Sequence, residues 1–294
     1  MRRWLITLPV ILVVSLLAGI VQNNCCSSGV DRERLFNTRE QAIRWMIENR
    51  ELINNRHNLA LWLMIKQAAE ISGDKRLNTL HKDYIQRNFQ ALKRSPWLPY
   101  LTPLPSYDLK NFDLTEVPDY QLFFIYGVTC NENLAMTDVI RRQMDINYCI
   151  RNHPLSPACV SHQLLGYRQV HINACLASSV TDESIRKLAA IIKWQLFFDF
   201  RMVDVYIQRL LVLFDSDHAE MVNYRWVERY LDAQRDDGGW SRAWELVSLG
   251  PEKSLVQKKL RPRIQAPKSD FHATAQGLLL ATFLLEEIEN PARR

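Results

Sequence analysis

The sequence predicts an all-α protein, and three observations support that class. Apolar residues recur at helical spacing along most of the chain. Gly and Pro, with 9 and 12 residues among 294, stand mainly between these stretches. No segment has the clear alternation of apolar and polar residues that marks a half-buried strand. We therefore expect antiparallel helix hairpins that close on themselves, preceded by one N-terminal hydrophobic helix.

Composition and charge limit the classes of function. The apolar content of 47% is enough for the core of one large domain or two small ones. The net charge of +5 is dispersed among acidic residues, so nucleic-acid binding is not indicated. The one basic cluster, residues 253–268, is interpreted as a solvated loop, with contact to an anionic surface as the alternative. The sequence lacks the glycine patterns that bind dinucleotides and nucleotide phosphates.

Residues 1–24 predict a signal peptide or a signal anchor. Arg2 and Arg3 precede an apolar run over residues 4–21. At ~1.5 Å per residue, this run as a helix has roughly the thickness of a membrane's hydrocarbon core. The preferred interpretation is a retained anchor: the membrane is then a partner through residues 4–21, and the body lies outside the cytoplasm. The alternative is export after cleavage near Ala18.

After this segment we expect a stalk over residues 25–37 and a single helical domain over residues 38–294. Four cysteines lie in the domain, an even number that permits disulfides in an oxidising compartment: Cys130, Cys149, Cys159 and Cys175. A bridge between Cys149 and Cys159 would close a short loop, and buried free thiols are the alternative. His and Cys are too dispersed for a structural zinc site, so no metal and no cofactor are expected.

Three helices are predicted at the start of the domain, over residues 38–52, 58–72 and 74–92. Thr38 begins a capping box for the first, Gly73 ends the second and Asp74 caps the third. Residues 95–118 hold five prolines among aromatic residues, which cannot form an ordinary helix interior. We expect a long loop packed on the body, with a lid over a site or a domain linker as alternatives.

Later helices are predicted over residues 119–127, 135–151, 159–176, 180–200, 217–234 and 269–285. Residues 202–214 are expected to continue the helix before them. Residues 215–217 are expected to cap the helix that ends at Gln234, and Ser269 or Asp270 the last one.

A short motif follows the helix that ends at Gln234. Tyr230, Gln234, Gly238 and Trp240 have the spacing Y-x3-Q-x3-G-x-W, and the capped apolar helix over residues 269–285 comes after them. This pattern resembles the QW motif of the terpenoid cyclase and protein prenyltransferase superfamily, whose members are α/α toroids. The resemblance implies an α/α-toroid-like array in which the Gln caps a helix end and the Trp stacks on it.

The catalytic motifs of that superfamily are not matched. Squalene-type cyclases carry D-x-D-D, whereas residues 215–218 are D-x-D-H, which helix capping explains. The Asp-x-Cys zinc pair of the prenyltransferases is missing, and His272 is one position out of register with their final His. The resemblance therefore implies the scaffold and neither activity.

Three polar residues share one face of an otherwise apolar segment. Arg201, Asp204 and Gln208 are spaced i, i+3 and i+7, so Arg201 and Asp204 would pair one turn apart. Polar groups in an apolar segment need a partner or water. Two interpretations fit: contacts to a ligand in a central cavity, or a paired and partly solvated edge, which is the more common case.

Histidines supply further candidates. His272 and Gln276 share a face of the last predicted helix, where an imidazole suits proton transfer, or more commonly bonds a neighbouring carbonyl. His162 stands beside Ser161, but adjacent helical residues point about 100° apart, which argues against a Ser/His dyad. Two aromatic residues of the proline-rich loop are secondary ligand contacts, because aromatic rings bind sugars and isoprenoids: Trp97 and Tyr107.

No catalytic constellation is evident, so the favoured function is a binding or scaffolding module of the cell envelope. The alternative is an envelope enzyme acting on a carbohydrate or isoprenoid-linked substrate, with His272, Asp204 and Arg201 as catalytic residues. The ligand expected in a central cavity is a small molecule or glycan. Convergence of these three side chains in one pocket would favour the enzyme.

Overall fold

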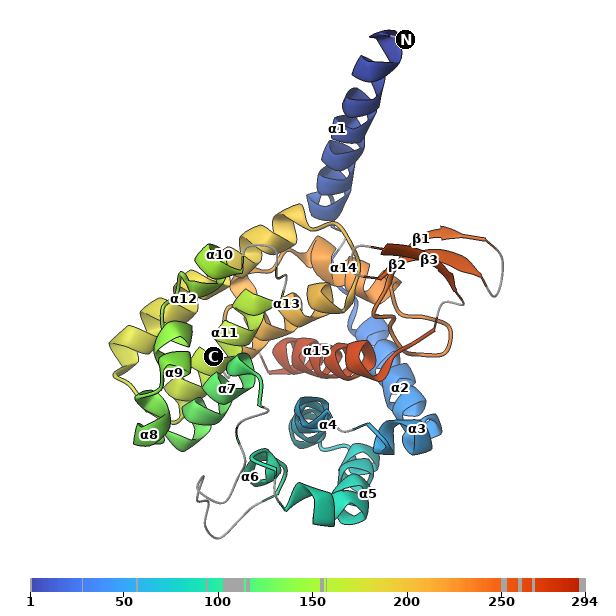
Figure 1. The fold of residues 1–294 in the computed structure, drawn as a ribbon. Coiled ribbons are helices and arrows are strands. Elements are labelled where there is room, and N and C mark those ends of the chain that lie inside the picture. The colour runs from blue at the N-terminus through green and yellow to red at the C-terminus, as the bar shows by residue number, and fades with distance from the viewer. Residues whose placement is uncertain are drawn as a thin grey trace.

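A computed structural model describes residues 2–27, 29–56, 58–93, 95–102, 114, 117–153, 156, 158–249, 253–258, 261–265 and 268–290, without the side chains of residues 2–12, 99, 247, 248 and 258. The described chain is mostly helical, which confirms the all-α class (Figure 1). Its helices are α1 (Arg2–Asn24), α2 (Arg32–Glu48), α3 (Arg50–Asn54), α4 (Leu59–Ser72), α5 (Lys75–Leu92), α6 (Leu98–Leu101), α7 (Asp119–Thr129), α8 (Glu132–Ala135), α9 (Asp138–Gln143), α10 (Tyr148–Asn152), α11 (Cys159–Ile172), α12 (Ser178–Phe198), α13 (Asp204–Asp215), α14 (Tyr224–Asp232) and α15 (Phe271–Glu289), with a short 3-10 turn at Ala219–Met221.

Several predicted helix ends are confirmed. The Asp74 carboxylate accepts hydrogen bonds from two backbone N–H groups in the first turn of α5. Gly73 follows α4 in the left-handed conformation, with φ 66°, which glycine adopts without strain. The Asp270 carboxylate accepts from a backbone N–H group of α15 and caps it.

The first helix of the body begins earlier than predicted. Asp31 accepts from two backbone N–H groups of the first turn of α2, so the helix starts at Arg32 and not at Thr38. Thr38 is buried inside α2, and residues 32–37 of the predicted stalk are helical. The capping-box signal was wrong here because another cap precedes it by almost two turns.

The chain breaks where continuous helices were predicted. α12 and α13 are separate, because Asp199 takes an extended backbone conformation. Residues 135–151 are divided among the short helices α8, α9 and α10. α14 is capped by Asn223 and not by residues 215–217, because the Asn223 side chain accepts from a backbone N–H group of its first turn.

The basic segment that was predicted as a loop contains a small antiparallel sheet. β1 (Trp244–Ser248) pairs with β2 (Ser254–Lys258), and β2 pairs with β3 (Arg261–Gln265). β3 is exposed along its whole length, at the edge of the body (Figure 1). The expectation of no strand is wrong because backbone pairing in a local meander does not require the alternating pattern of a half-buried strand.

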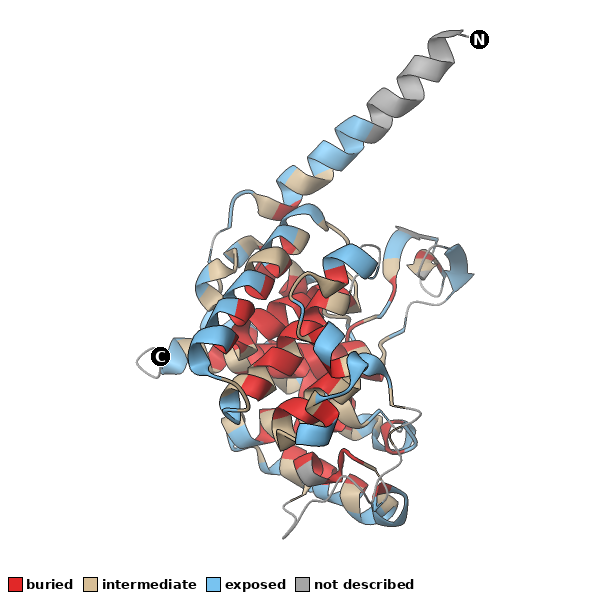
Figure 2. Ribbon diagram, turned by 60° about the vertical axis from the view of Figure 1, so that its left-hand side comes forward, coloured by how far each residue is buried: buried red, intermediate tan, exposed pale blue. Residues whose placement is uncertain are grey.

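α15 lies in the interior of the body. It packs against α2, α4 and α13, and nearly all of its residues from Phe271 to Leu285 are buried. Buried residues concentrate in the interior helices (Figure 2). A helix that is apolar on almost every side needs such a position. It carries His272 and Gln276 into the interior.

The QW segment (residues 230–240) connects three helices. The Trp240 ring stacks on Tyr230, with 5.1 Å between ring centroids, and its Nε1 donates to the Tyr230 carbonyl oxygen at 3.0 Å. Gln234 Nε2 donates to a carbonyl oxygen of α2 and to that of Gly238, each at 2.9 Å. The Tyr230 hydroxyl donates to a carbonyl oxygen of α15. The segment thus links α14 to α2 and α15, although Trp240 stacks on Tyr230 and not on Gln234.

Two disulfides join the helices of the central part of the chain. Cys130–Cys175 links the end of α7 to the turn after α11, and Cys149–Cys159 links α10 to α11. For these four cysteines the bridged alternative is confirmed, and free thiols are excluded.

α1 projects from one end of the body, and its last turn contacts the body (Figure 1). Asn23 is buried there: its Nδ2 donates to the Leu196 carbonyl oxygen at 2.7 Å, and its Oδ1 accepts from the Tyr206 hydroxyl at 3.0 Å and from Arg229. Within the described part of the chain, no helix is long and apolar enough to cross a membrane. The predicted anchor over residues 4–21 includes side chains outside the described part.

Candidate functional site

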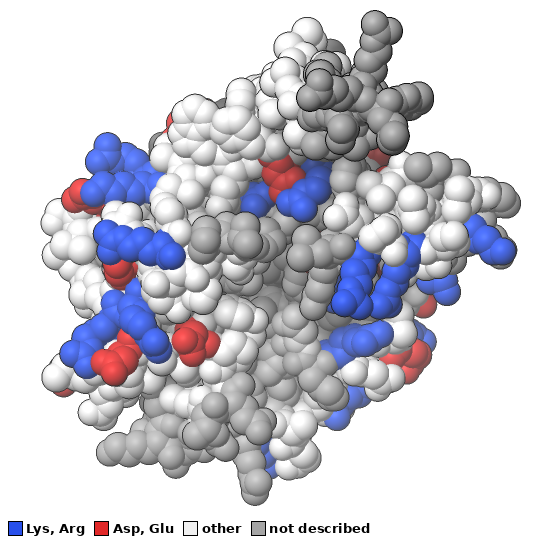
Figure 3. Space-filling model, turned by 45° about the horizontal axis from the view of Figure 1, so that its top comes forward, with Lys and Arg blue, Asp and Glu red and all other residues white. Residues whose placement is uncertain are grey.

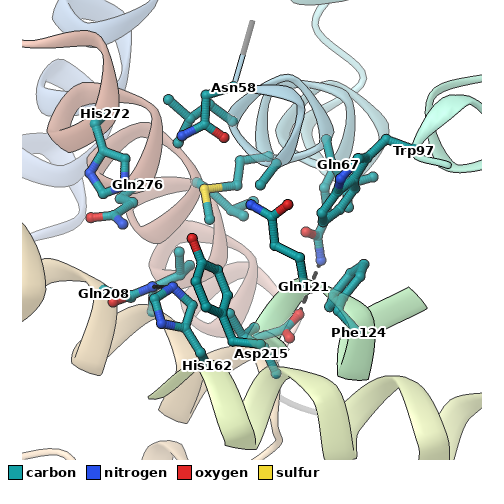
Figure 4. Close-up of a pocket in the computed structure, with 18 of the residues that line it drawn as sticks. Asn58, Gln67, Trp97, Gln121, Phe124, His162, Gln208, Asp215, His272 and Gln276 are labelled. Atoms are coloured by element: carbon teal, nitrogen blue, oxygen red, sulfur yellow. Dashed lines mark hydrogen bonds between the residues drawn. The ribbon is translucent and has the colours of Figure 1, made fainter. Parts of the chain in front are cut away.

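A cavity lies where α15 faces α4, α7, α11 and α13 (Figure 4). The volume open to the centres of water-sized molecules is about 140 Å³, which is room for several waters. Each helix contributes residues three or four positions apart, as one helical face requires. These are Ala60, Met64 and Gln67 of α4, Gln121 and Phe124 of α7, His162, Leu165 and Gln169 of α11, Gln208, Leu211 and Asp215 of α13, and His272, Gln276 and Leu279 of α15.

Neighbouring helices follow one another around this cavity. α4 packs on α15, α15 on α13, α13 on α11, and α11 on α7. Trp97, which precedes α6, stacks against Phe124 of α7 with 5.3 Å between ring centroids, and α6 packs on α4. Contacts therefore continue from α4 around the cavity and back to α4.

The polar lining of the cavity consists mainly of side-chain amides, from Asn58, Gln67, Gln121, Gln169, Gln208 and Gln276. A carboxamide offers a hydrogen-bond donor and an acceptor without a net charge. Apart from Asp215, His162 and His272, the remaining walls are apolar or aromatic, with Trp97 and Phe124 at one end. This combination suits an uncharged ligand that has both polar groups and apolar faces.

Gln276 differs from the other amides in its bonding. It is fully buried, yet neither its Oε1 nor its Nε2 has a hydrogen-bond partner among the described residues. Figure 4 shows it beside His272 at the cavity. Leaving a buried polar group unbonded costs about 1–3 kcal/mol, so such groups normally bond water or a ligand.

His162 is held by a network around Gln208. Gln208 Oε1 accepts from the Ser161 hydroxyl at 3.1 Å, and its Nε2 lies 3.2 Å from His162 Nε2. Because the amide nitrogen of Gln208 can only donate, His162 Nε2 accepts this hydrogen bond, and the imidazole is therefore neutral. Burial, together with the nearby His272, lowers the pKa of His162 to about 4. Ser161 and His162 contact the same carboxamide but not each other, as their predicted divergence implied.

Asp215 is the acidic residue of this cavity. Its Oδ1 accepts from Gln67 Nε2 at 3.1 Å (dashed in Figure 4). Burial raises the pKa of Asp215, although Arg168 and Gln67 act in the opposite direction. A carboxyl group with a raised pKa in a cavity is suited to binding or transferring a proton. The sequence predicted Asp215 as a helix cap and did not predict that it lines a cavity.

A second cavity, of about 360 Å³ by the same measure, shares His162, Gln208 and His272 with the first. Here His272 Nδ1 lies 3.3 Å from Asp204 Oδ2, outside regular hydrogen-bond geometry. Arg242 Nε lies 3.5 Å from the same oxygen. Burial acts to raise the pKa of Asp204, but contacts with His272 and Arg242 outweigh it, so that pKa is lowered.

Arg201 does not pair with Asp204. It lies in the break between α12 and α13, so the one-turn spacing of a helix does not apply. Its Nε and Nη2 donate to the two carboxylate oxygens of Asp199 at 2.7 and 2.8 Å, and Arg209 donates to the same carboxylate. Of the three predicted catalytic residues, His272 and Asp204 meet, and Arg201 only lines the second cavity.

The two aromatic candidates differ in position. Trp97 lines the first cavity and is buried beside Tyr100, whereas Tyr107 is outside the described residues. Sequence reasoning missed Gln67, Gln121 and Gln169. A usable signal was present, because each is a glutamine in a helix whose neighbours are largely apolar.

Among the described residues, no three His, Cys, Asp or Glu side chains group closely enough to hold a metal ion. Comparison of the chain with protein-family models, curated proteins and solved structures returns no match. Function is therefore inferred from the cavity residues.

Proposed function

We propose that the protein is a binding module of the cell envelope, which holds a small uncharged ligand with hydroxyl or amide groups, such as a sugar unit, in the amide-lined cavity. The observation that carries this proposal is Gln276, a fully buried carboxamide without a hydrogen-bond partner among the described residues. A ligand hydroxyl or amide group would satisfy both of its atoms. The rings of Trp97 and Phe124 supply the apolar surface on which a sugar face packs.

Two features support a location outside the cytoplasm. Disulfides persist in oxidising compartments and are rare in the cytosol, and the chain contains Cys130–Cys175 and Cys149–Cys159. The N-terminal basic pair and the apolar run over residues 4–21 favour a retained anchor, with export after cleavage as the alternative.

The proposed architecture is an α/α-toroid-like array. The order of helix contacts around the cavity supports it, because they lead from α4 through α15, α13, α11, α7 and α6 back to α4. The QW segment supports it as well, because its hydrogen bonds link α14 to α2 and α15.

Calorimetric titration with N-acetylglucosamine, glucose and farnesol tests the ligand class on the full chain in detergent. We expect N-acetylglucosamine, which has hydroxyls and an acetamide, to bind most tightly. Gln276→Met keeps the side-chain volume but removes the carboxamide, so it should weaken this binding about tenfold or more. Binding of farnesol alone, no binding of either sugar, or equal affinity in Gln276→Met contradicts the proposal.

Gln163→Met is the matched control. Gln163 is also fully buried, but its Nε2 donates to the backbone carbonyl oxygens of Gln143 and Asp145 away from the cavity. We expect unchanged sugar affinity in this variant. Equal weakening in both variants would mean that the effect comes from the fold and not from the cavity.

A second candidate function depends on the contact between His272 and Asp204. Asp204 would orient His272 as a general base toward a carbohydrate or isoprenoid-linked substrate. Arg201 lines the same cavity but is held by Asp199, which it shares with Arg209, and it does not contact Asp204 or His272, so this alternative assigns it no step. Mass spectrometry of N-acetylglucosamine oligomers and farnesyl-linked N-acetylglucosamine incubated with the protein tests it. A product formed by the natural chain and lost in His272→Gln and Asp204→Asn supports the enzyme; no product in the natural chain contradicts it.

A further inference from the structure

Three aromatic side chains form an exposed cluster at the end of α12. Trp194, Phe197 and Phe198 are 62%, 37% and 55% exposed. Their rings pack on one another, with centroid distances of 5.1 to 5.9 Å. The core side of α12 is formed by other residues, which are buried: Leu188, Ile192 and Leu196. Contiguous exposed apolar surface of this kind marks an interaction site.

This aromatic cluster lies beside the base of α1. Asn23 and Asn24 donate their side-chain amides to the carbonyl oxygens of Leu196 and Phe197. The described solvent-facing part of α1 is also apolar, with exposed Val13, Val14, Leu16, Leu17 and Val21. The apolar surface therefore continues from α1 onto the body, at the end where α1 projects (Figures 1 and 2).

The charges near the cluster fit a lipid surface. From residue 184 to residue 198, α12 carries no Asp or Glu, and its exposed Lys193 precedes Trp194, whereas Lys187 is paired with Glu183 one turn before it. Figure 3 views the face from which α1 rises: white, uncharged surface lies on one side of the projecting helix, and a small group of acidic and basic residues lies at its base. Tryptophan and phenylalanine beside basic residues are typical of the boundary between headgroups and acyl chains.

We propose that Trp194, Phe197 and Phe198 form a second membrane contact, which rests in the headgroup region of the bilayer that α1 engages. This inference rests on the membrane anchor in the proposed function, and not on the ligand of the cavity. An anchor alone leaves the body free to tilt, whereas a second contact fixes which side of the body faces the lipid. The exposed Lys193 of α12 would then meet anionic headgroups.

Quenching of tryptophan fluorescence by brominated phosphatidylcholine tests the contact. The full chain is reconstituted in phosphatidylcholine–phosphatidylglycerol vesicles, with Trp4→Phe as background so that only the body reports. Trp194 is the one indole more than a third exposed among the described side chains. We expect brominated lipid to quench the background protein, and added Trp194→Phe to remove most of the quenching. Added Trp244→Phe, the matched control on the sheet, should retain it.

The possible outcomes separate the inference from the proposed function. Protein that floats with vesicles but shows no quenching overturns the second contact and leaves the anchor intact. Protein that does not float with vesicles contradicts both the anchor and this contact. If brominated lipid does not quench the background protein and analytical ultracentrifugation shows a dimer, a second copy of the chain covers the cluster, and the proposal is overturned.

Discussion

At the scale of single residues, the buried glutamines of this protein differ in what they bond. Gln163 Nε2 donates to the backbone carbonyl oxygens of Gln143 and Asp145 at 2.7 Å, so its amide joins α11 to the end of α9. Gln208 connects Ser161 with His162. Gln276 bonds none of the described residues. A buried amide without a partner lowers the free energy of unfolding, so a role of Gln276 in ligand binding explains its position better than a role in stability.

Replacement of Gln276 and of Gln163 by methionine is expected to change the free energy of unfolding in opposite directions. Gln276→Met removes an unbonded buried amide and should raise the free energy of unfolding by about 1 kcal/mol in ligand-free protein. Gln163→Met leaves two backbone carbonyl groups without their donor and should lower it by about 1–3 kcal/mol. Urea denaturation of both variants measures the change. A clear loss in Gln276→Met would mean that ordered water already satisfies the amide.

The lowered pKa of His162 predicts a loss of stability in mild acid. Its pKa is about 4 in the folded state, against about 6.5 in the unfolded chain. Between these values the unfolded state binds more protons, so the free energy of unfolding falls as the pH falls through this window. From about pH 7 to about pH 5 the expected loss from this residue is about 2 kcal/mol.

His162→Gln should remove that part of the loss. His81, whose pKa burial also lowers to about 4, contributes in the same window and remains in the variant. The measurement is denaturation at both pH values for the natural chain and His162→Gln. An identical pH dependence would show that the pKa of His162 is the same in the folded and unfolded states.

At the scale of elements, the QW segment packs so closely on α15 and α2 that Gly277 and Gly238 leave no room for a larger side chain. A Cβ atom on Gly277 would lie 2.6 Å from the Trp240 ring. Gly238 has φ 88°, and a Cβ there would lie 2.5 Å from the Gln41 carbonyl oxygen of α2. The pattern of glycines and one tryptophan therefore specifies how closely three helices approach.

Gly277→Ala is expected to lower the free energy of unfolding by about 1–3 kcal/mol, because overpacking displaces Trp240. In a Trp240→Leu background the same substitution should cost less or even stabilise, since alanine favours a helix over glycine by about 1 kcal/mol. A double-mutant cycle by denaturation measures this coupling. Additive effects would place the Trp240 ring away from Gly277.

The two disulfides are expected to differ in their contribution to stability. Cys130–Cys175 spans 45 residues and Cys149–Cys159 spans 10. In the chain-entropy model, replacement of the longer pair by alanine should cost about 4 kcal/mol and of the shorter pair about 3 kcal/mol. Denaturation of the two double variants under non-reducing conditions tests the order. A larger loss from the shorter pair would show that native-state contacts outweigh loop entropy.

Local signals in the sequence predicted some elements better than others. Gly73, Asp74 and Asp270 act within one turn of the chain, so the helix ends they mark were found correctly. The break at Asp199 was not found, because it depends on bonds to Arg201 and Arg209, which fold back across the turn. The sheet was missed because its pairing is not encoded in an alternating pattern.

At the scale of the whole molecule, the candidate site was only partly predictable. His272, Gln276, Gln208 and His162 could be found because helical spacing places them on inward faces. The contact between His272 and Asp204 joins α15 to α13 and requires the tertiary packing. Which glutamines face the cavity likewise depends on how five helices meet, and no single helix carries that information.

Several hydrogen bonds join the base of α1 to the body, and those of Asn23 are the most buried of them. Asn23 bonds the Leu196 carbonyl oxygen, the Tyr206 hydroxyl and the Arg229 guanidinium, and so joins α1 to α12, α13 and α14. Asn23→Ala would remove one buried hydrogen bond from each of these three groups, although Arg229 keeps its bond to the Phe200 carbonyl oxygen, and should loosen the base of α1. Each 1.4 kcal/mol corresponds to about a tenfold change in an opening equilibrium, so exchange in the last turn of α1 should accelerate about tenfold or more.

Hydrogen exchange followed by mass spectrometry of peptides covering residues 18–24 measures this acceleration. Asn55→Ala is the control, because the Asn55 amide donates within its own turn, to the Glu51 carbonyl oxygen, at an exposed position. If Asn23→Ala exchanges no faster than Asn55→Ala, other contacts, such as the packing of Gly19 on Phe200, hold α1 in place. Faster exchange combined with weaker quenching of Trp194 by brominated lipid would show that the attachment of α1 to the end of α12 brings the aromatic cluster to the membrane, since Asn23 donates to the carbonyl oxygens of Leu196 and Phe197.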